Sequence, residues 1–365
     1  MSQSGTGRSD AAVVRIEVPL FRPHPLIKNC HWQTILGAYL PHKKYPYNAV
    51  QQRVMLDDGD QLVIHDDCPT AWKVGDYVAI LVHGLGGCHS SPYMIRVAAK
   101  LNAVGVRTFR MDMRGCGAGI ELAIHPFHAG RSEDLRRVVE SVRGRCPSSP
   151  VSAIGFSLGA NLVTKLAGEL GERGNELLDS AFAVAPPIDL LECSKFLGKG
   201  WNKIYDQAFL RTLNRIRSKR AKAGRDVGRA EQTARSLYQF DDFYTAPVSG
   251  FRDAEHYYEM SSSNHLLSHI RVPTMILTSG DDPLIPFHIF ESAAMSEFVH
   301  LHATEHGGHL GFLGRPNEDA DQRWMDWRVT DWIKLRLAAN SLQTDGSDAQ
   351  EPAPDQLLAS ETRDV

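Results

Sequence analysis

Short apolar segments that alternate with helical patterns are the feature that most narrows the folds open to this chain. The apolar segments are Tyr77–Val82, Val106–Met111, Val151–Phe156, Ser180–Val184, Thr274–Ser279 and Phe298–His302. Helical patterns over Pro92–Asn102, Ser132–Val142 and Leu158–Leu170 fall between them. Strands that are apolar throughout are covered on both faces. The order therefore predicts an α/β fold with a mostly parallel central sheet and helices on both faces.

The alternation stops between about Pro187 and Ser263, where helix formers are frequent and clear strands are lacking. A helical lid inserted at this point would cover the ligand crevice at the carboxyl edge of the sheet. We predict an N-terminal extension over 1–48, the first part of the core over 49–186, the helical lid insertion over 187–261 and the second part of the core over 262–340. Residues 341–365 are rich in Asp, Gln, Pro, Ala and Ser, which predicts a disordered tail.

Composition excludes several classes of protein. Of the 365 residues 42% are apolar and 23% charged, and the net charge of −3 gives no reason to expect nucleic acid as a partner. The six cysteines are scattered without C-x-x-C spacing, which favours reduced thiols in the cytoplasm. The segment Met1–Asp10 lacks the pattern of a signal peptide, and no apolar run reaches the ~18 residues of a membrane span. We expect a cytoplasmic protein that is soluble or attached to a membrane only at its surface.

A candidate nucleophile lies at the end of one apolar segment. Gly155-Phe156-Ser157-Leu158-Gly159 fits the G-x-S-x-G pattern of a nucleophile elbow, a sharp strand-to-helix turn. The flanking glycines are needed because side chains there would collide. The alternative is a glycine-rich turn with an ordinary capping serine. The pattern stands between a predicted strand and a predicted helix, which favours Ser157 as a nucleophile.

A second glycine-rich segment, His83-Gly84-Leu85-Gly86-Gly87, directly follows the strand Tyr77–Val82. This is the loop from which such a fold donates a backbone N–H to the oxyanion hole. We predict the N–H groups of Leu85 and Leu158 as the two donors, and a structural role for His83. The segment lacks the Lys-Ser/Thr ending of a phosphate loop, so it predicts no nucleotide cofactor.

The candidate acid lies in Gly280-Asp281-Asp282-Pro283, directly after the strand Thr274–Ser279. Either aspartate has the right place in the chain order. The spacing to the following prolines favours Asp282, and Asp281 stays open as the alternative.

The candidate base is His309 in Gly307-Gly308-His309-Leu310-Gly311, after the last predicted strand. Ser157, Asp282 and His309 then follow one another in the order of a hydrolase triad of this fold. The nearby His302 and His306 suggest a metal, but no carboxylate or cysteine stands at ligand spacing, so none is predicted. The turn Gly115–Gly119 departs from the spacing of a dinucleotide fingerprint, and no cofactor is predicted there either.

From about His24 to Ile333 the chain resembles a known family, the YheT-like alpha/beta-hydrolases. The matching segments are His31-Trp32-Gln33-Thr34-Ile35-Leu36, Arg114-Gly115-Cys116-Gly117, Phe127-His128-Ala129-Gly130 with Glu133-Asp134-Leu135, Phe240-Asp241, Thr245-Ala246-Pro247, Gly250-Phe251 and Tyr257-Tyr258. Phe127 stands where the family usually has Tyr, Trp32 where it commonly has a smaller residue, and the membrane anchor of some members has no counterpart here. The resemblance implies the alpha/beta-hydrolase fold and hydrolysis of an acyl ester, without naming the ester.

These features predict a serine hydrolase that cleaves carboxylic esters through an acyl-enzyme, without metal or cofactor. The substrate would be a small-molecule or lipid ester. Two alternatives remain open: an acyltransferase or thioesterase that uses the same triad, and a non-catalytic binding module of the same fold.

The predicted lid carries a local excess of positive charge. Its basic residues after Cys193 are Lys195, Lys199, Lys203, Arg211, Arg215, Arg217, Lys219, Arg220, Lys222, Arg225 and Arg229. Such a lid could contact an anionic membrane surface or attract a substrate with an acidic head group. The alternative is a solvated helix face that aids solubility. Under the first hypothesis, replacing Arg217, Lys219, Arg220 and Lys222 with Gln should remove a preference for acidic vesicles and leave hydrolysis of a small soluble ester intact.

Overall fold

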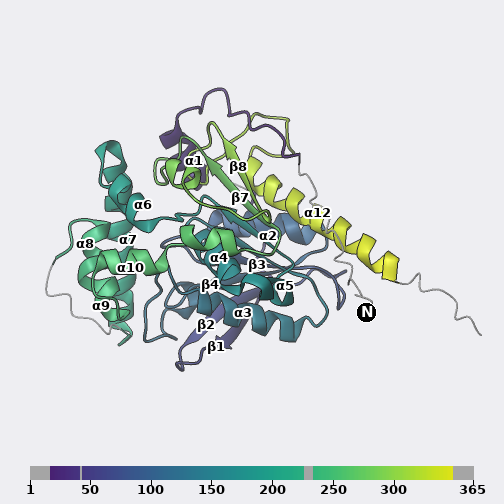
Figure 1. Ribbon diagram of the computed structural model, residues 1–365, viewed down its shortest axis with the longest axis horizontal. Helices are drawn as coiled ribbons and strands as arrows, with labels where there is room; N and C mark the ends of the chain where they lie inside the picture. The colour runs from purple at the N-terminus through teal and green to yellow at the C-terminus, as the bar shows by residue number, and fades with distance from the viewer. Residues whose placement is uncertain (1–16, 42, 226–232, 348–365) are drawn as a thin grey trace, which may run out of the picture.

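The structure is a computed structural model that describes residues 17–41, 43–225 and 233–347 (Figure 1). Its centre is an eight-stranded sheet in the order β1-β2-β4-β3-β5-β6-β7-β8. The strands are β1 (Val50–Met55), β2 (Gln61–Asp67), β3 (Val78–Val82), β4 (Arg107–Asp112), β5 (Val151–Phe156), β6 (Ser180–Val184), β7 (Thr274–Ser279) and β8 (Val299–Thr304). The pairs β1–β2 and β2–β4 are antiparallel, and all other neighbours are parallel.

Helices cover both faces of this sheet, as Figure 1 shows. The α-helices of the described residues are α1 (Cys30–Tyr39), α2 (Pro92–Ala103), α3 (Ser132–Arg145), α4 (Leu158–Leu170), α5 (Gly174–Leu177), α6 (Leu190–Leu197), α7 (Lys203–Lys222), α8 (Leu237–Phe240), α9 (Ala246–Val248), α10 (Ala254–Ser261), α11 (His288–Glu291) and α12 (Trp324–Ser347). One buried cluster joins the sheet to α3 and α4, and a second joins the opposite face to α2 and α12. The predicted α/β class, with a mostly parallel sheet and helices on both faces, is confirmed.

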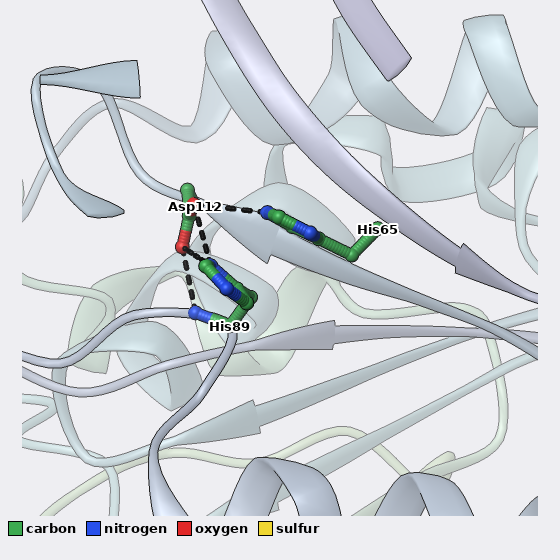
Figure 2. Close-up of side chains that lie close together, drawn as sticks. All are labelled: His65, His89 and Asp112. Carbon is green, nitrogen blue, oxygen red and sulfur yellow. Dashed lines mark hydrogen bonds and ion pairs between the residues drawn. The ribbon is translucent and has the colours of Figure 1, made fainter. Parts of the chain in front are cut away.

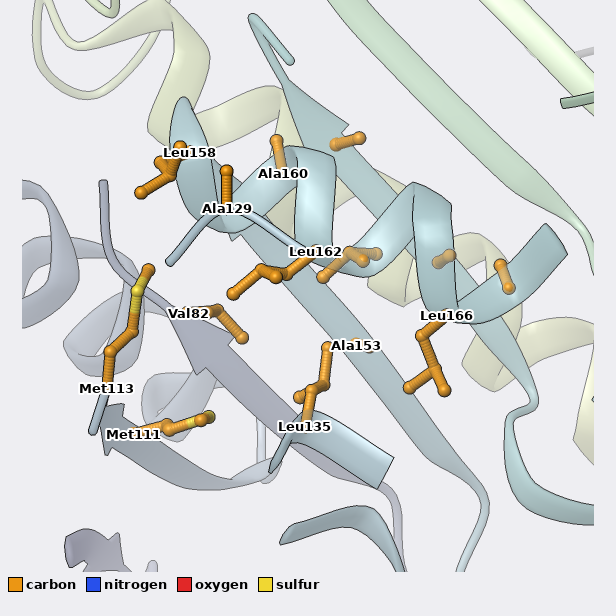
Figure 3. Close-up of a cluster of buried hydrophobic side chains, with 14 of the residues drawn as sticks. Val82, Met111, Met113, Ala129, Leu135, Ala153, Leu158, Ala160, Leu162 and Leu166 are labelled. Atoms are coloured by element: carbon orange, nitrogen blue, oxygen red, sulfur yellow. The ribbon is translucent and has the colours of Figure 1, made fainter. Parts of the chain in front are cut away.

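Strand β3 shows why its apolar sequence is required. Its five residues are all fully buried. Because successive side chains of a strand point to opposite faces, Val78, Ile80 and Val82 pack toward α3 and α4, while Ala79 and Leu81 pack toward α2 and α12. Figure 3 shows the first of these layers, where α4 lies over the central strands. With both faces buried in this way, β3 has an apolar side chain at each of its five positions.

The turn from β5 into α4 has no intervening loop. Ser157 is the hinge, with φ 51° and ψ −119°, a conformation that costs a non-glycine residue free energy. A Cβ at Gly155 would lie 2.3 Å from the carbonyl oxygen of Gly159, and one at Gly159 would lie 2.4 Å from that of Val82. The helix can therefore sit against β3 and β5 only because both positions are glycine.

The segment between β6 and β7 contains five α-helices in its described part, α6 to α10, which lie together at one side of the molecule in Figure 1. A small apolar cluster of Leu210, Leu213, Phe240 and Tyr244 joins α7 to the segment that follows it. The bounds of the predicted extension, lid and core segments stay predictions, because the limits of helices and strands do not by themselves define where one segment of the fold ends and the next begins.

The sequence did not indicate every element. Strands β5, β6 and β7 have the predicted bounds, and β4 and β8 are shifted by one or two residues. Strands β1 and β2 and helix α1 were missed. The prediction of a disordered tail from Ser341 is wrong for its first residues, because α12 continues to Ser347. The helix-forming run around Leu337 and Ala338 carries the helix past the predicted boundary. The rest of the predicted tail, 348–365, lies outside the described residues.

No helix within residues 17–41, 43–225 and 233–347 is both long and apolar enough to cross a membrane.

Replacing Gly155 with Ala should lower the free energy of unfolding by about 2–3 kcal/mol, because the new methyl group collides with the backbone of α4. The control is Gly144→Ala in α3, where a Cβ would meet no atom within 4 Å. That change should raise stability by about 0.5–1 kcal/mol, since alanine is the better helix former. Urea unfolding followed by circular dichroism measures both. Equal effects of the two substitutions would contradict the steric account of the turn.

Candidate active site

Three side chains from distant parts of the chain meet at the carboxyl edge of the sheet. Ser157 stands at the β5–α4 turn, Asp282 follows β7, and His309 follows β8. The Nε2 atom of His309 lies 2.8 Å from Ser157 Oγ, and its Nδ1 atom lies 2.8 Å from Asp282 Oδ2. An ionised carboxylate can only accept, so Nδ1 carries the proton and Nε2 is left to accept one from Ser157.

The two neighbouring aspartates have different partners. Asp282 is fully buried, and its second oxygen accepts the N–H groups of Leu284 at 2.8 Å and Ile285 at 3.1 Å. Asp281 turns to the other side, where it accepts the Gly308 N–H at 2.9 Å and lies 3.3 Å from His306 Nδ1. Of the two aspartates left open by the sequence, only Asp282 contacts His309 in the structure.

The loop that carries His309 is held by helix α1. Thr34 Oγ1 accepts the backbone N–H of His309 at 2.9 Å. The buried side chain of Gln33 donates to the carbonyl oxygens of Ile27 and Leu313 and accepts the N–H of Leu313 at 2.7 Å. A Cβ at Gly311 would lie 2.3 Å from the Gln33 carbonyl oxygen, so the loop packs directly on the helix. The sequence comparison singled out this helical segment as a motif, but nothing in it indicated a contact with His309.

Ser157 opens onto an apolar pocket with about 100 Å³ of free volume between the sheet edge and the lid helices. The apolar lining residues include Leu85, Phe127, Leu158, Pro187, Leu190, Leu197, Phe209, Leu213, Leu237, Phe240, Tyr244, Leu284 and Ile285. Leu85 and Leu158, whose backbone N–H groups we predict as oxyanion donors, thus both border the same pocket as Ser157. A Cβ at Gly84 would lie 3.1 Å from the Ser157 Cβ, so the loop before Leu85 runs against the serine.

His83 and Tyr93 fix the loop that precedes Leu85. The Met113 N–H donates to His83 Nε2 at 3.1 Å, so Nδ1 carries the proton and donates to the Gly84 carbonyl at 2.8 Å. Complete burial lowers the pKa of His83, although the bond to Gly84 acts in the opposite direction, and the ring is neutral. Tyr93 Oη accepts the Gly84 N–H at 2.9 Å. His83 therefore positions the loop and does not point its free lone pair at Ser157.

A buried cluster of His65, His89 and Asp112 lies beneath this loop, and Figure 2 shows both imidazoles directed at the carboxylate. His65 Nε2 lies 3.1 Å and His89 Nδ1 2.8 Å from Asp112 Oδ2, which also accepts the Ala118 N–H. The rings stack at 3.5 Å with 19° between their planes. Both rings contact the same carboxylate oxygen, so the three side chains are engaged with one another as a hydrogen-bonded support of the loop.

The electrostatics of this cluster match that role. Burial would raise the pKa of Asp112, but the hydrogen bonds from His65 and His89 outweigh it and hold the pKa well below its usual range. The Asp112 Oδ1 atom also accepts the backbone N–H of His89 at 2.6 Å. The carboxylate thus ties the far end of the His83–Gly87 loop to strands β2 and β4.

A second acidic group, Asp58, Asp60 and His125, is occupied by a cation of the chain itself. The buried guanidinium of Arg114 binds Asp58, binds Asp60 at 2.8 Å, and forms a two-pronged pair with Asp134 at 2.6 and 2.9 Å. A metal ion would need the oxygens that Arg114 already holds. The histidines near His309 also separate, since His302 stacks on Trp324 while His306 contacts Asp281.

The basic residues of the lid divide between two faces of α7. Lys203, Arg211, Arg215, Lys219 and Lys222 are exposed and recur at helical spacing. Arg217 and Arg220 instead line the pocket of Ser157. Arg220 is only 2% exposed, and the Arg217 guanidinium lies over the Tyr244 ring at 4.3 Å. The four residues that the membrane hypothesis grouped together are therefore divided, because the amphipathic helix turns Arg217 and Arg220 toward the pocket and leaves Lys219 and Lys222 exposed.

The fold and the edge-of-sheet site together define a class of protein. Residues 79–322 match the alpha/beta hydrolase family, and the chain belongs to that family. Within it, the chain is similar to the protein YheT of Escherichia coli (strain K12), with 31% identity over 336 residues that cover 88% of this chain and 95% of YheT. The predicted YheT-like relationship is thereby confirmed.

More distant relatives carry esterase and lipase names. Phospholipase ABHD3 of Mus musculus is 26% identical over 291 residues, which cover 77% of this chain and 70% of that protein. The solved structure of the Pyrococcus furiosus esterase Pf2001 superposes with a TM-score of 0.52 at 15% identity, covering 81% of this chain and 97% of that one, which bears on the fold alone. The chain is thus an alpha/beta hydrolase related to esterases and lipases.

Replacing Gln33 with Leu should lower the free energy of unfolding by about 2–3 kcal/mol, because it leaves the buried N–H group of Leu313 without its partner and removes the bonds from Gln33 to the carbonyls of Ile27 and Leu313. Gln51→Leu is the matched control, since Gln51 is exposed on the edge strand β1. Thermal and urea unfolding of both variants measure the difference. A loss no larger for Gln33 than for Gln51 would show that the α1 contact does not hold the loop.

Proposed function

We propose that this protein is a serine hydrolase that cleaves carboxylic esters through an acyl-enzyme. The observation that carries the proposal is the unbroken hydrogen-bond path from Ser157 through His309 to the buried Asp282, beside an apolar pocket. Membership of the alpha/beta hydrolase family and its esterase and lipase relatives support the same reaction class.

In the proposed first step, Ser157 Oγ attacks the acyl carbonyl carbon while His309 Nε2 takes the hydroxyl proton. Asp282 holds the imidazole in the tautomer that can accept this proton and stabilises the imidazolium that forms. The backbone N–H groups of Leu85 and Leu158 would stabilise the negative oxygen of the tetrahedral intermediate. His309 then returns the proton to the leaving alcohol, and the ester bond breaks.

In the second step, His309 removes a proton from water, which attacks the acyl group on Ser157. The tetrahedral intermediate collapses, the carboxylic acid leaves, and Ser157 regains its proton from His309. The apolar lining of the pocket favours a substrate with a hydrocarbon part, because burial of such surface stabilises the bound state. We therefore propose a small-molecule or lipid ester as the substrate.

The direct test is covalent labelling with a fluorophosphonate, which reacts with activated serines. We expect labelling at Ser157, identified by mass spectrometry of the labelled peptide. Ser157→Ala should abolish labelling and reduce turnover of a 4-nitrophenyl ester by roughly 10⁴-fold or more. A label on another serine, or full turnover in the variant, would reject the assignment. Added alcohols that divert the acyl group into new esters would instead indicate an acyltransferase.

The two aspartates provide a matched control for this test. Asp282→Asn removes the carboxylate that orients His309, whereas Asp281→Asn changes a neighbour that contacts only His306 and Gly308. Both changes remove one charge without changing size, so their difference isolates the contact with His309. Turnover should fall much further for Asp282→Asn.

We also propose that the lid contacts an anionic membrane surface. Lys203, Arg211, Arg215, Lys219 and Lys222 form the exposed basic face of α7. At its start, Trp201 is 78% and Ile204 57% exposed. Helix α1 adjoins this end, because His31 of α1 lies 3.0 Å from the Tyr205 hydroxyl, and its own Trp32 is 57% exposed. Exposed aromatic residues beside a basic helix face suit the interface of an anionic lipid layer.

Vesicles that contain phosphatidylserine should therefore bind the protein more tightly than neutral vesicles, and salt should weaken this preference as the Debye length shortens below ~10 Å. Replacing the five residues of the basic face with Gln should remove the preference. The control replaces Arg53, Lys73, Arg136, Arg145 and Arg173, exposed cations outside the lid, and should retain it. Cosedimentation measures binding. Equal loss in both variants would mean that net charge alone, not the lid, is responsible.

A further inference from the structure

Arg220 has an unusual environment for a charged side chain. Arg220 is the largest of the fully buried side chains in the described part of the chain, and it lines the pocket of Ser157. Its Nη2 atom donates to the carbonyl oxygens of Ile124 at 2.7 Å and Arg225 at 2.9 Å. Its Nε and Nη1 atoms are buried and have no hydrogen-bond partner within the part of the chain that the structure describes. The guanidinium is anchored at one nitrogen and unsatisfied at the other two.

The pocket supplies no counter-charge to this guanidinium from the described residues. Asp241 is the carboxyl group among the lining residues, and it accepts the Tyr258 hydroxyl at 2.7 Å. Burial raises the pKa of Asp241 to about 6, and its hydrogen bonds to Thr245 and Tyr258 act in the opposite direction. A buried cation without a paired anion is costly, because it has lost its hydration and gained only carbonyl dipoles.

The surrounding backbone makes room for the Arg220 head group. A Cβ at Gly115 would lie 1.9 Å from Nη1 of Arg220, so any other residue at that position would displace the guanidinium. A second guanidinium, that of Arg217, reaches the pocket one helical turn earlier and lies over Tyr244. Two arginines of one helix therefore border the pocket, which gives its lid side a positive character although most of the lining is apolar.

We propose that Arg220 binds an anionic oxygen group of the substrate, a carboxylate or a phosphate, in the pocket of Ser157. This inference rests on the proposed function and narrows its substrate class to esters that carry such a group at a distance from the scissile bond. A planar guanidinium donates to carboxylate and phosphate oxygens in a matching geometry. The bound anion supplies the partner that the two unsatisfied N–H groups lack. Arg220 is thus a specificity-determining residue.

Two matched pairs of substrates test the proposal. In the first, 4-nitrophenyl octanoate is compared with the mono-4-nitrophenyl ester of octanedioic acid, which adds a carboxylate to the acyl end. In the second, a monoacylglycerol is compared with its phosphate of the same acyl chain. We expect kcat/KM to favour the anionic member of at least one pair. Arg220→Gln should reduce that ratio about tenfold or more, since it removes a charged hydrogen bond.

Arg53→Gln is the control, because it removes the same charge from an exposed position of β1, outside both the pocket and the basic face of α7, and should leave the ratio unchanged. Arg220→Lys keeps the charge and should retain part of the preference, which covers the case in which Arg220→Gln fails to fold. A wild-type enzyme that favours the neutral member of both pairs, or a ratio insensitive to Arg220→Gln, would overturn the proposal. Labelling of Ser157 with cleavage of neutral esters only would reject the anion site and leave the hydrolase assignment intact; absence of both would reject the two together.

Discussion

The contact between β5 and the first turn of α4 is the constraint on which the rest of the site depends. With glycine at positions 155 and 159, the helix starts within contact distance of β3 and β5, and Ser157 must take up a left-handed conformation between them. This strain is held by the buried layers on both faces of the sheet. It also places the hydroxyl at the carboxyl edge, where the parallel order of β7 and β8 delivers Asp282 and His309 to the same point. Both the parallel pairing of the strands and the tight turn at Ser157 are thus needed to bring the three side chains together.

Helix α7 shows how one segment can serve two environments. Its outer face carries exposed lysines and arginines, while its inner face presents Leu210, Leu213 and Arg220 to the interior. The separation follows from helical periodicity, since residues three or four apart share a face. In the sequence the positive charges of α7 form a single block, but in the structure the cations of the outer face and those of the inner face have different surroundings. The outer cations are screened by water and salt. The inner cations lie where water is excluded, and electrostatic interactions are stronger there.

The sequence predicted those parts of the molecule that follow from local pattern. Strand β3 is wholly apolar, and β5, β6 and β7 are fully buried and mostly apolar, so each stands out as a short apolar run. The turn at Ser157 follows the G-x-S-x-G spacing, which is specific to a strand-to-helix elbow. Strands β1 and β2 were missed because β1 is largely exposed and β2 contains His65 and Asp66, buried polar residues whose partners lie elsewhere in the chain. The roles of Gln33, Thr34 and Arg220 also depend on distant contacts, with Leu313, His309 and Ile124. No local pattern encodes such pairs.

The dependence of the His309 loop on α1 has a consequence for how the chain matures during synthesis. Helix α1 is made early, yet its partners are Gly308, Leu313 and Arg323, whose guanidinium donates to the carbonyls of Gly37 and Leu40. Domains commonly form in the order in which they leave the ribosome. Here the first helix must wait, with Gln33 and Gly37 uncovered, until most of the chain has emerged. The hydrolase is therefore assembled by closure of its two ends, and a nascent chain arrested before residue 323 would contain Ser157 in its elbow but no anchored His309.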